Sequence, residues 1–269
     1  MRPILLEIFG VSFGSYRTCL TIAFLLGTFL AVREVHRRSD GYTVSPVGGI
    51  WAFFGALLGA RAFYVIHYQE VTDIWRALLV WESGLVFHGG LVGAIIAITV
   101  YLRFCRAPWW KTFDVLAVFT PLGQAITRVG CFLNGCCHGT PTDLPWGVRF
   151  PAGSDAYVYQ FEHKIIDAFT PHTVPVHPAQ LYMAVGLVAM FVVLRIILDR
   201  KQTDGVVGLT YLAFYGLLRF TVEFVRGDND AVLMGLTLYQ VISVALVAIA
   251  VGGLVVIRYR DRLSESSTN

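Results

Sequence analysis

Hydrophobic residues in this chain form seven long runs that are separated by polar segments. A helix that crosses a bilayer needs about 20 mainly apolar residues. The runs that meet this need are residues 16–32, 46–66, 85–104, 112–129, 179–198, 205–225 and 235–257. The pattern predicts an all-α integral membrane protein with seven transmembrane helices. No cleavable signal peptide is evident before Tyr16, so we expect the first helix to stay as an anchor.

Composition agrees with this pattern. The chain of 269 residues is 56% hydrophobic and only 14% charged, whereas soluble domains carry about 25% charged residues. Aromatic residues make up 14%, as expected where rings gather at membrane interfaces. Five cysteines are too few for a disulfide scaffold. Nucleic-acid binding is not supported, since the basic residues flank membrane segments instead of forming a stripe.

Basic residues cluster on alternate loops. Of the 21 lysines and arginines, twelve lie in one set of loops: Arg33, Arg37, Arg38, Arg103, Arg106, Lys111, Arg195, Arg200, Lys201, Arg258, Arg260 and Arg262. Such loops face the cytoplasm, which predicts an external N-terminus and a cytoplasmic C-terminus. We expect one membrane domain over residues 1–269, within which residues 130–178 form an external loop region. Loops of that length are usually functional or disordered.

Charged side chains inside a membrane are costly, so they are functional candidates. The predicted topology places six ionisable residues in or near the outer half of the membrane: Arg61, His88, Arg128, Arg219, Glu223 and Arg226. Together with Tyr215, the last three are spaced by four, four and three residues, which puts them on one helix face. An internal ion pair of Glu223 with Arg219 or Arg226 is one interpretation of this face.

An ion pair cannot neutralise every cation, because four arginines accompany a single intramembrane acid. A positively charged pocket in the outer leaflet favours an anion, and arginine binds phosphate in a bidentate manner. The sequence therefore predicts a phospholipid headgroup as the ligand. His88 is followed by Gly89 and Gly90, small residues that permit close approach of a helix or a ligand. Histidine is the natural proton acceptor near neutral pH, so His88 is either a catalytic or ligand-contacting residue or a structural one.

Four sequence blocks now carry a family resemblance. They read SGLVFHGGL at 83–91, TRVGCFLNG at 127–135, HPAQLY at 177–182, and YGLLR at 215–219 running into EFVR at 223–226. In their order and spacing the chain resembles the prolipoprotein diacylglyceryl transferases, which are bacterial inner-membrane enzymes. The resemblance implies transfer of a diacylglyceryl group from phosphatidylglycerol to the lipobox cysteine of a preprolipoprotein. A thioether forms and glycerol phosphate leaves.

The resemblance also implies roles for individual residues. His88 matches the general base, while Arg128 and Arg219 match a phosphate clamp. The expected phosphatidylglycerol site comprises Tyr16, Arg61, Arg128, Asn134, Gly139, Arg219, Glu223 and Arg226. His177 and Gln180 fall in a matching block beside the external loop and are candidates for structural roles. No metal and no organic cofactor is expected.

This chain departs from the resemblance at several positions. Cys131 stands where well-known members have asparagine, Cys136 where an acid is frequent, and Met183 where glutamate is frequent. Together with Cys137 and His138, the cysteines leave three interpretations open. They are structural cysteines or a disulfide from Cys131 to Cys136 or Cys137, a tolerated variant of the lipid site, and a metal site. The adjacency of Cys136 and Cys137 disfavours joint binding of one ion.

Two other functions remain open at this stage. A lipid or anion transporter would also place cations in a membrane cavity, although the chain lacks the internal repeat expected of many transporters. A phospholipid-binding relative with altered or lost chemistry would account for the substitutions at Cys131 and Met183.

Overall fold

The computed structural model describes residues 4–8, 11–39, 44–68, 86–167, 169–201, 203–229 and 231–268. Eight helices lie in these ranges: α1 (Ser15–Arg38), α2 (Val47–Tyr68), α4 (Phe87–Phe104), α5 (Trp109–Asn134), α6 (Asp155–Glu162), α7 (Ala179–Arg200), α8 (Val206–Glu223) and α9 (Leu238–Thr268). Two short antiparallel hairpins pair β1 (Ile4–Ile8) with β2 (Val11–Gly14), and β3 (Ala231–Leu233) with β4 (Leu236–Thr237). The expected all-α membrane architecture is confirmed.

Six of these helices are long and apolar enough to cross a bilayer: α1, α2, α5, α7, α8 and α9. Each of the seven predicted segments contains a helix, but in the third, α4, the apolar helix of the described residues runs only from Gly89 to Phe104, which is shorter than the other six. Residue 85, at its predicted start, lies outside the described residues. The helices leave much of their apolar surface exposed. In α9, only 17% of the most apolar window is buried, as suits a surface that faces lipid.

The chain divides into two compact units. The first comprises Met1–Gly27 and Phe113–Asn269, and the second comprises Thr28–Thr112. Helices α1 and α5 each pass from one unit to the other. The single membrane domain expected from the sequence stays a prediction.

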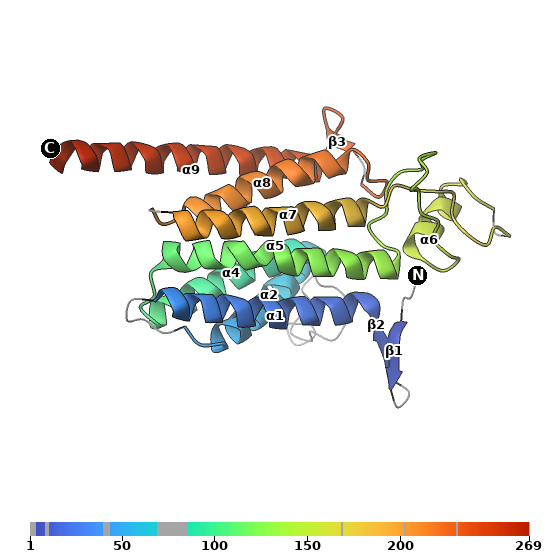
Figure 1. The fold of residues 1–269 in the computed structure, drawn as a ribbon. Coiled ribbons are helices and arrows are strands. Elements are labelled where there is room, and N and C mark those ends of the chain that lie inside the picture. The colour runs from blue at the N-terminus through green and yellow to red at the C-terminus, as the bar shows by residue number, and fades with distance from the viewer. Residues whose placement is uncertain are drawn as a thin grey trace. The chain divides into compact units, whose positions relative to one another are not determined.

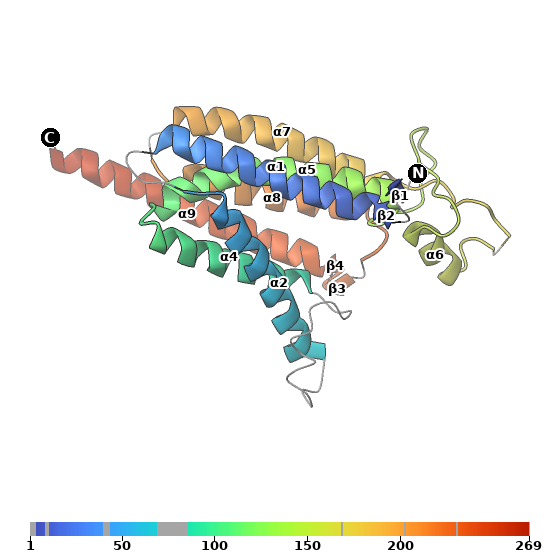
Figure 2. The same ribbon diagram turned by 90° about the horizontal axis from the view of Figure 1, so that it is seen from below.

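In the first unit, α5, α7, α8 and α9 run alongside one another (Figures 1 and 2). Asp114 near the start of α5 is fully buried and organises one end of this bundle. Its carboxylate accepts hydrogen bonds from the backbone N–H groups of Gly205 and Gly208, both at 2.8 Å, and pairs with Lys201. A carboxylate is favourable at the N-terminus of a helix, where backbone donors lack partners. This contact anchors α8 against α5.

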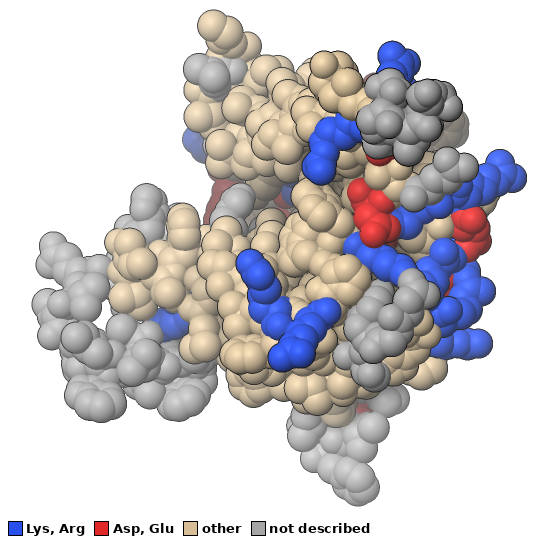
Figure 3. Space-filling model, turned by 90° about the vertical axis from the view of Figure 1, so that its left-hand side faces the viewer, with Lys and Arg blue, Asp and Glu red and all other residues tan. Residues whose placement is uncertain are grey.

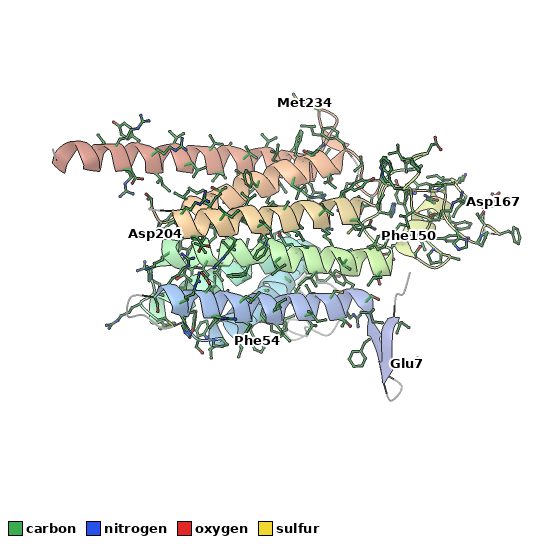
Figure 4. All side chains as sticks on the ribbon, in the orientation of Figure 1. Glu7, Phe54, Phe150, Asp167, Asp204 and Met234 are labelled. Carbon is green, nitrogen blue, oxygen red and sulfur yellow. The ribbon has the colours of Figure 1, made fainter. Side chains whose placement is uncertain are left out.

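At the opposite end, residues between α5 and α7 fold into a small head that contains α6 (Figure 1). Its core consists of Phe150, Ala156 and Val176, all without exposed surface (Figure 4). Ser154 begins α6 by accepting a hydrogen bond from the Tyr157 N–H, a common N-cap arrangement. The buried Gln160 side chain accepts from the Val174 N–H at 2.9 Å. This stretch is therefore ordered, and its predicted external location is untested.

In the second unit, α2 and α4 pack together through glycines. A Cβ atom built at Gly93 would collide with the backbone oxygen of Gly55, and one at Gly59 would collide with that of Gly89. Small residues permit such close approach between membrane helices, which is stabilised by van der Waals contact. The glycines after His88 therefore serve helix packing.

We expect Gly93→Ala to destabilise the protein by about 1–3 kcal/mol, because an added methyl group must separate two backbones. The thermal unfolding midpoint in detergent would measure this loss. Gly252→Ala in α9 is a matched control, since a Cβ atom there meets nothing within 4 Å. Equal midpoints for the two variants would contradict tight packing between α2 and α4.

Candidate active site

An ion pair lies at the end of α8 that is nearest the head. Arg219 Nη1 is 2.6 Å from Glu223 Oε2, and both side chains are buried. Their spacing of four residues places them on one helix face, as the sequence predicts. Arg226 Nε is 3.8 Å from the same oxygen. The ion pair expected for Glu223 is therefore present, and it involves both candidate arginines.

Neighbouring side chains hold this ion pair in place. The Asn229 amide and the Thr237 hydroxyl each donate to Glu223 Oε1 at 2.8 Å. The Arg219 guanidinium lies 4.4 Å from the centre of the Tyr239 ring, a distance suited to a cation–π interaction. Sequence reasoning missed these partners, because they follow a chain reversal after α8 and carry no helical spacing relative to Arg219.

Arg226 has a second acid, Asp228, in a bidentate pair with N–O distances of 2.9 and 2.6 Å. Although burial disfavours the charged guanidinium, these hydrogen bonds and the charge of Asp228 raise the pKa of Arg226 above its ordinary value. Its charge is thus largely balanced within the protein. This partner could be found in the sequence, because Asp228 is only two residues away.

Arg128 differs from the other two arginines. It lies in the last two turns of α5 and is partly exposed. Within the described ranges, no carboxylate lies within 4.0 Å of its guanidinium. It is nevertheless close enough to Arg219 and Tyr16 to interact with them electrostatically. Arg128 therefore carries a positive charge that is available to a ligand.

Tyr16 reaches this cluster because Gly130 lets two helices approach. A Cβ atom at Gly130 would lie 2.7 Å from Cys19 Cβ and 3.2 Å from Tyr16 Cα. The first distance is too short for a Cβ atom at residue 130 and the second is a tight contact, so the start of α1 packs directly against the end of α5. Tyr16 lies at this junction with 38% of its surface exposed.

Gly139 joins the head to the segment that follows α8. It forms an isolated β-bridge with Arg226, and the Thr140 N–H donates to the Val225 oxygen at 2.9 Å. The Gly139 N–H donates to the His177 oxygen at 3.1 Å, and a Cβ at Gly139 would meet that residue. The predicted site residue Gly139 is thus a backbone junction that leaves no room for a side chain.

Gln180 and His177 make structural contacts, as their candidate roles suggested. The buried Gln180 amide donates to the Cys136 oxygen at 2.7 Å, which ties α7 to the loop after α5. His177 Nδ1 lies 3.2 Å from the Tyr182 hydroxyl, which also accepts from the Trp146 indole at 2.7 Å.

The three clustered cysteines gather where α5 ends. Gly135 adopts a left-handed conformation, with φ of 87°. The N–H groups of Gly135 and Cys136 both donate to the Cys131 oxygen, at 2.9 and 3.2 Å. This pattern is a Schellman-type helix end, which folds the chain back on its last turn. Cys131, Cys136 and Cys137 are free thiols, and their Sγ atoms all lie within 4.8 Å of one another.

Cys137 is the thiol most disposed to ionise in this cluster. Hydrogen bonds from Cys131 and Cys136, together with the charges of Arg226 and Arg128, lower the pKa of Cys137 below its ordinary value. Asn134 interacts with Cys136 across the same helix end. Cys131, which stands where well-known members of the resembled family have asparagine, thus lies inside the arginine-rich site.

The remaining predicted site residues belong to the second unit. Arg61 is buried in α2, where its guanidinium lies 5.5 Å from the centre of the Tyr64 ring. His88 is the second residue of α4, and its side chain lies outside the described residues. Their membership of the same site stays a prediction from the sequence. Within the first unit, the structure brings together Tyr16, Arg128, Asn134, Gly139, Arg219, Glu223 and Arg226.

Guanidinium groups outnumber carboxylates at this site. Arg219 and Arg226 pair with Glu223 and Asp228, while Arg128 lies close enough to Arg219 to act on it electrostatically. Among these arginines and acids, cations exceed anions by one, and Cys137 is a further group that can carry negative charge here. Although Arg219 Nη1 and Glu223 Oε2 are close, neither completes a well-aligned hydrogen bond within the described part of the chain. An arginine-rich site at the end of a bundle of apolar helices is suited to an anionic, membrane-soluble ligand.

Comparison with known proteins identifies the class more closely. The family described as prolipoprotein diacylglyceryl transferase matches residues 3–256. A phosphatidylglycerol–prolipoprotein diacylglyceryl transferase of Mannheimia succiniciproducens is 34% identical, over 97% of this chain and 94% of the relative. Proteins with the same name from Geobacter sulfurreducens and Neisseria meningitidis are 33% and 30% identical, over 85% and 94% of this chain and 83% and 94% of the relatives. The chain belongs to the prolipoprotein diacylglyceryl transferase family.

Proposed function

We propose that this protein transfers the diacylglyceryl group of phosphatidylglycerol to the cysteine thiol of a prolipoprotein in the bacterial inner membrane. This is the first step of lipoprotein maturation. Family membership over nearly the whole chain is the observation that carries the assignment. The protein is accordingly a multi-pass membrane enzyme whose partners are phosphatidylglycerol and prolipoproteins.

The arginine cluster supports a site for the lipid phosphate. Arg128 would contact the phosphate first, because it has no acid of its own within the described residues. Arg219 would add a second contact, because its buried Nη1 has no hydrogen-bond partner among the described residues. Tyr16, Asn134 and Gly139 would surround the headgroup, with Arg226 and Glu223 fixing the geometry. Arg61 is proposed to extend this site.

The reaction forms a carbon–sulfur bond and breaks a carbon–oxygen bond. The thiol of the substrate loses its proton, and the resulting thiolate attacks the glyceryl carbon that carries the phosphate oxygen. That oxygen leaves with both electrons as part of glycerol phosphate. Stabilisation of the departing charge by fixed cations lowers the barrier most effectively in a water-poor site, which is the role we assign to Arg128 and Arg219.

His88 is proposed to accept the proton of the thiol. A free cysteine has a pKa near 8.5, so little thiolate exists at neutral pH without a base. Neutral imidazole can take this proton, and general bases contribute about a hundredfold to ten-thousandfold to a rate. The position of His88 in the FHGG block supports the assignment. The expected mechanism uses no metal and no organic cofactor.

We also propose seven membrane spans with an external N-terminus and a cytoplasmic C-terminus. Helix α4, with 18 residues, would extend about 27 Å at 1.5 Å per residue, close to the thickness of the hydrocarbon core, about 30 Å. The ends of α7 and α9 carry Arg195, Arg200, Arg258, Arg260 and Arg262. Basic side chains stand out when the molecule is viewed from that end (Figure 3), which supports a cytoplasmic location. The head at residues 130–178 would then be external.

A transfer assay tests the proposed function. We expect the purified protein, supplied with phosphatidylglycerol and a lipobox peptide, to yield a thioether-linked diacylglyceryl peptide and an equal amount of glycerol phosphate. Mass spectrometry of both products measures the reaction. A peptide with serine in place of the lipobox cysteine is the control, because an alcohol ionises far less readily than a thiol. Bound lipid without either product would refute the transferase and favour a phospholipid-binding protein with lost chemistry.

A further inference from the structure

We propose that Cys131, Cys136 and Cys137 form a binding site for a soft, thiophilic metal ion, with monovalent copper as the best match. The three Sγ atoms lie within 4.8 Å of one another. Metal–sulfur bonds of about 2.3 Å would bring three thiolates to about 4 Å from each other around a trigonal ion. The cluster therefore needs only small side-chain movements to close on an ion.

The backbone already holds two of these residues together. The Schellman-type end of α5 turns the chain back so that Cys136 lies beside Cys131, with Cys136 Sγ 3.7 Å from the Cys131 oxygen. Cys137 has a left-handed backbone, with φ of 58°. Adjacent cysteines were expected to disfavour one ion, yet here both Sγ atoms lie in the same cluster. Because of this turn in the chain, the adjacency of Cys136 and Cys137 does not prevent both from binding one ion.

The donor set selects the class of ion. No histidine or carboxylate of the described residues joins the three sulfur atoms. His138, the nearest candidate in the sequence, has Nδ1 3.1 Å from the Gly139 oxygen and its ring centre 5.0 Å from that of Tyr159. Structural zinc almost always takes four ligands, whereas a site made only of thiolates suits monovalent copper.

The surroundings favour the complex electrostatically. Three thiolates and one monovalent ion carry a net charge of −2, and Arg226 and Arg128 lie close enough to act on Cys137. Cys131 is buried, while Cys136 and Cys137 are partly exposed and leave a path for the ion. The proposed complex would consequently share Arg128 with the proposed phosphate site.

Competition for copper tests the site directly. The reduced protein in detergent, with five titratable thiols, is titrated with monovalent copper in the presence of the chelator bicinchoninate, whose coloured copper complex reports the free ion. We expect one copper per chain to be withdrawn from the chelator. Cys136→Ser and Cys137→Ser should each weaken binding at least a hundredfold, while Cys19→Ala and Cys105→Ala keep wild-type affinity.

Two outcomes would overturn the site. Equal affinity in wild type and the cluster variants would assign the copper elsewhere, and a protein that lacks two titratable thiols and takes up no copper would hold a disulfide instead. A second measurement rests on the proposed function. One equivalent of copper should slow transfer at least tenfold in wild type but less than twofold in Cys137→Ser, each relative to its own copper-free rate. Copper binding by a protein without transfer activity would refute the proposed function and leave the metal site standing.

Discussion

Replacing Arg128 with alanine should reduce the rate of diacylglyceryl transfer by about a hundredfold to a thousandfold, the usual effect of removing one charge-stabilising donor. Arg128 has no carboxylate partner within the described ranges, so its charge is available to the lipid phosphate. For the same reason, its removal breaks no ion pair. We therefore expect an unchanged thermal midpoint beside the lost activity in the transfer assay.

Two further variants make this result specific. Arg128→Lys keeps the charge but loses the planar fork that binds phosphate in a bidentate manner, and we expect it to recover only part of the rate. Arg258→Ala, at an exposed position of α9, controls for general loss of positive charge and should be fully active. Near-normal transfer by Arg128→Ala would remove this residue from the clamp.

Arg219 requires a different experimental design, because its replacement removes the nearest cation of the buried Glu223 carboxylate. Arg219→Ala should lower transfer to a similar extent, but it leaves the buried Glu223 with only the longer contact to Arg226, and breaking a buried pair costs up to about 3–5 kcal/mol of stability. Arg219→Ala combined with Glu223→Gln removes that unpaired charge. If Arg219 contacts the phosphate, the double variant regains the thermal midpoint without regaining transfer. Recovery of transfer in the double variant would reduce Arg219 to a structural role.

Helical periodicity explains how much of this architecture could be predicted. Apolar runs locate every long helix, since the lipid imposes both length and composition. The spacing of Arg219, Glu223 and Arg226 likewise predicts their shared face, and the structure confirms their ion pairs. These features depend on local sequence alone. The local sequence also shows that Arg226 has an acid, Asp228, two residues away. It does not show that the charge of Arg128 is available to a ligand, because that depends on contacts in the folded chain.

Chain reversals account for what could not be predicted. Thr237, the last residue of β4, and Tyr239, just after the hairpin of β3 and β4, reach the ion pair, and no helical spacing relates them to α8. The cysteine cluster depends on the left-handed conformations of Gly135 and Cys137, and a left-handed cysteine is uncommon. The adjacency of Cys136 and Cys137 in the sequence therefore predicts side chains that point apart, whereas the left-handed backbone brings their sulfur atoms together.

His88→Gln should reduce transfer at pH 7 by about a hundredfold to ten-thousandfold, the contribution expected of a general base. Glutamine keeps polarity and approximate size but cannot accept the proton of the thiol. The remaining activity should depend on the thiolate that forms without help. Its rate should rise about tenfold per pH unit and level off near pH 8.5, the pKa of a free cysteine.

The pH profile separates a base from a structural residue. Wild-type enzyme, in which His88 accepts the proton, should show less change over the same range, so the two rates converge as the pH rises. His172→Gln in the head replaces an exposed histidine and should follow the wild-type profile. A His88→Gln defect of constant size from pH 7 to pH 9 would contradict proton transfer to His88. The proton would then pass to another acceptor, for which the phosphate of the lipid is the nearest chemical candidate.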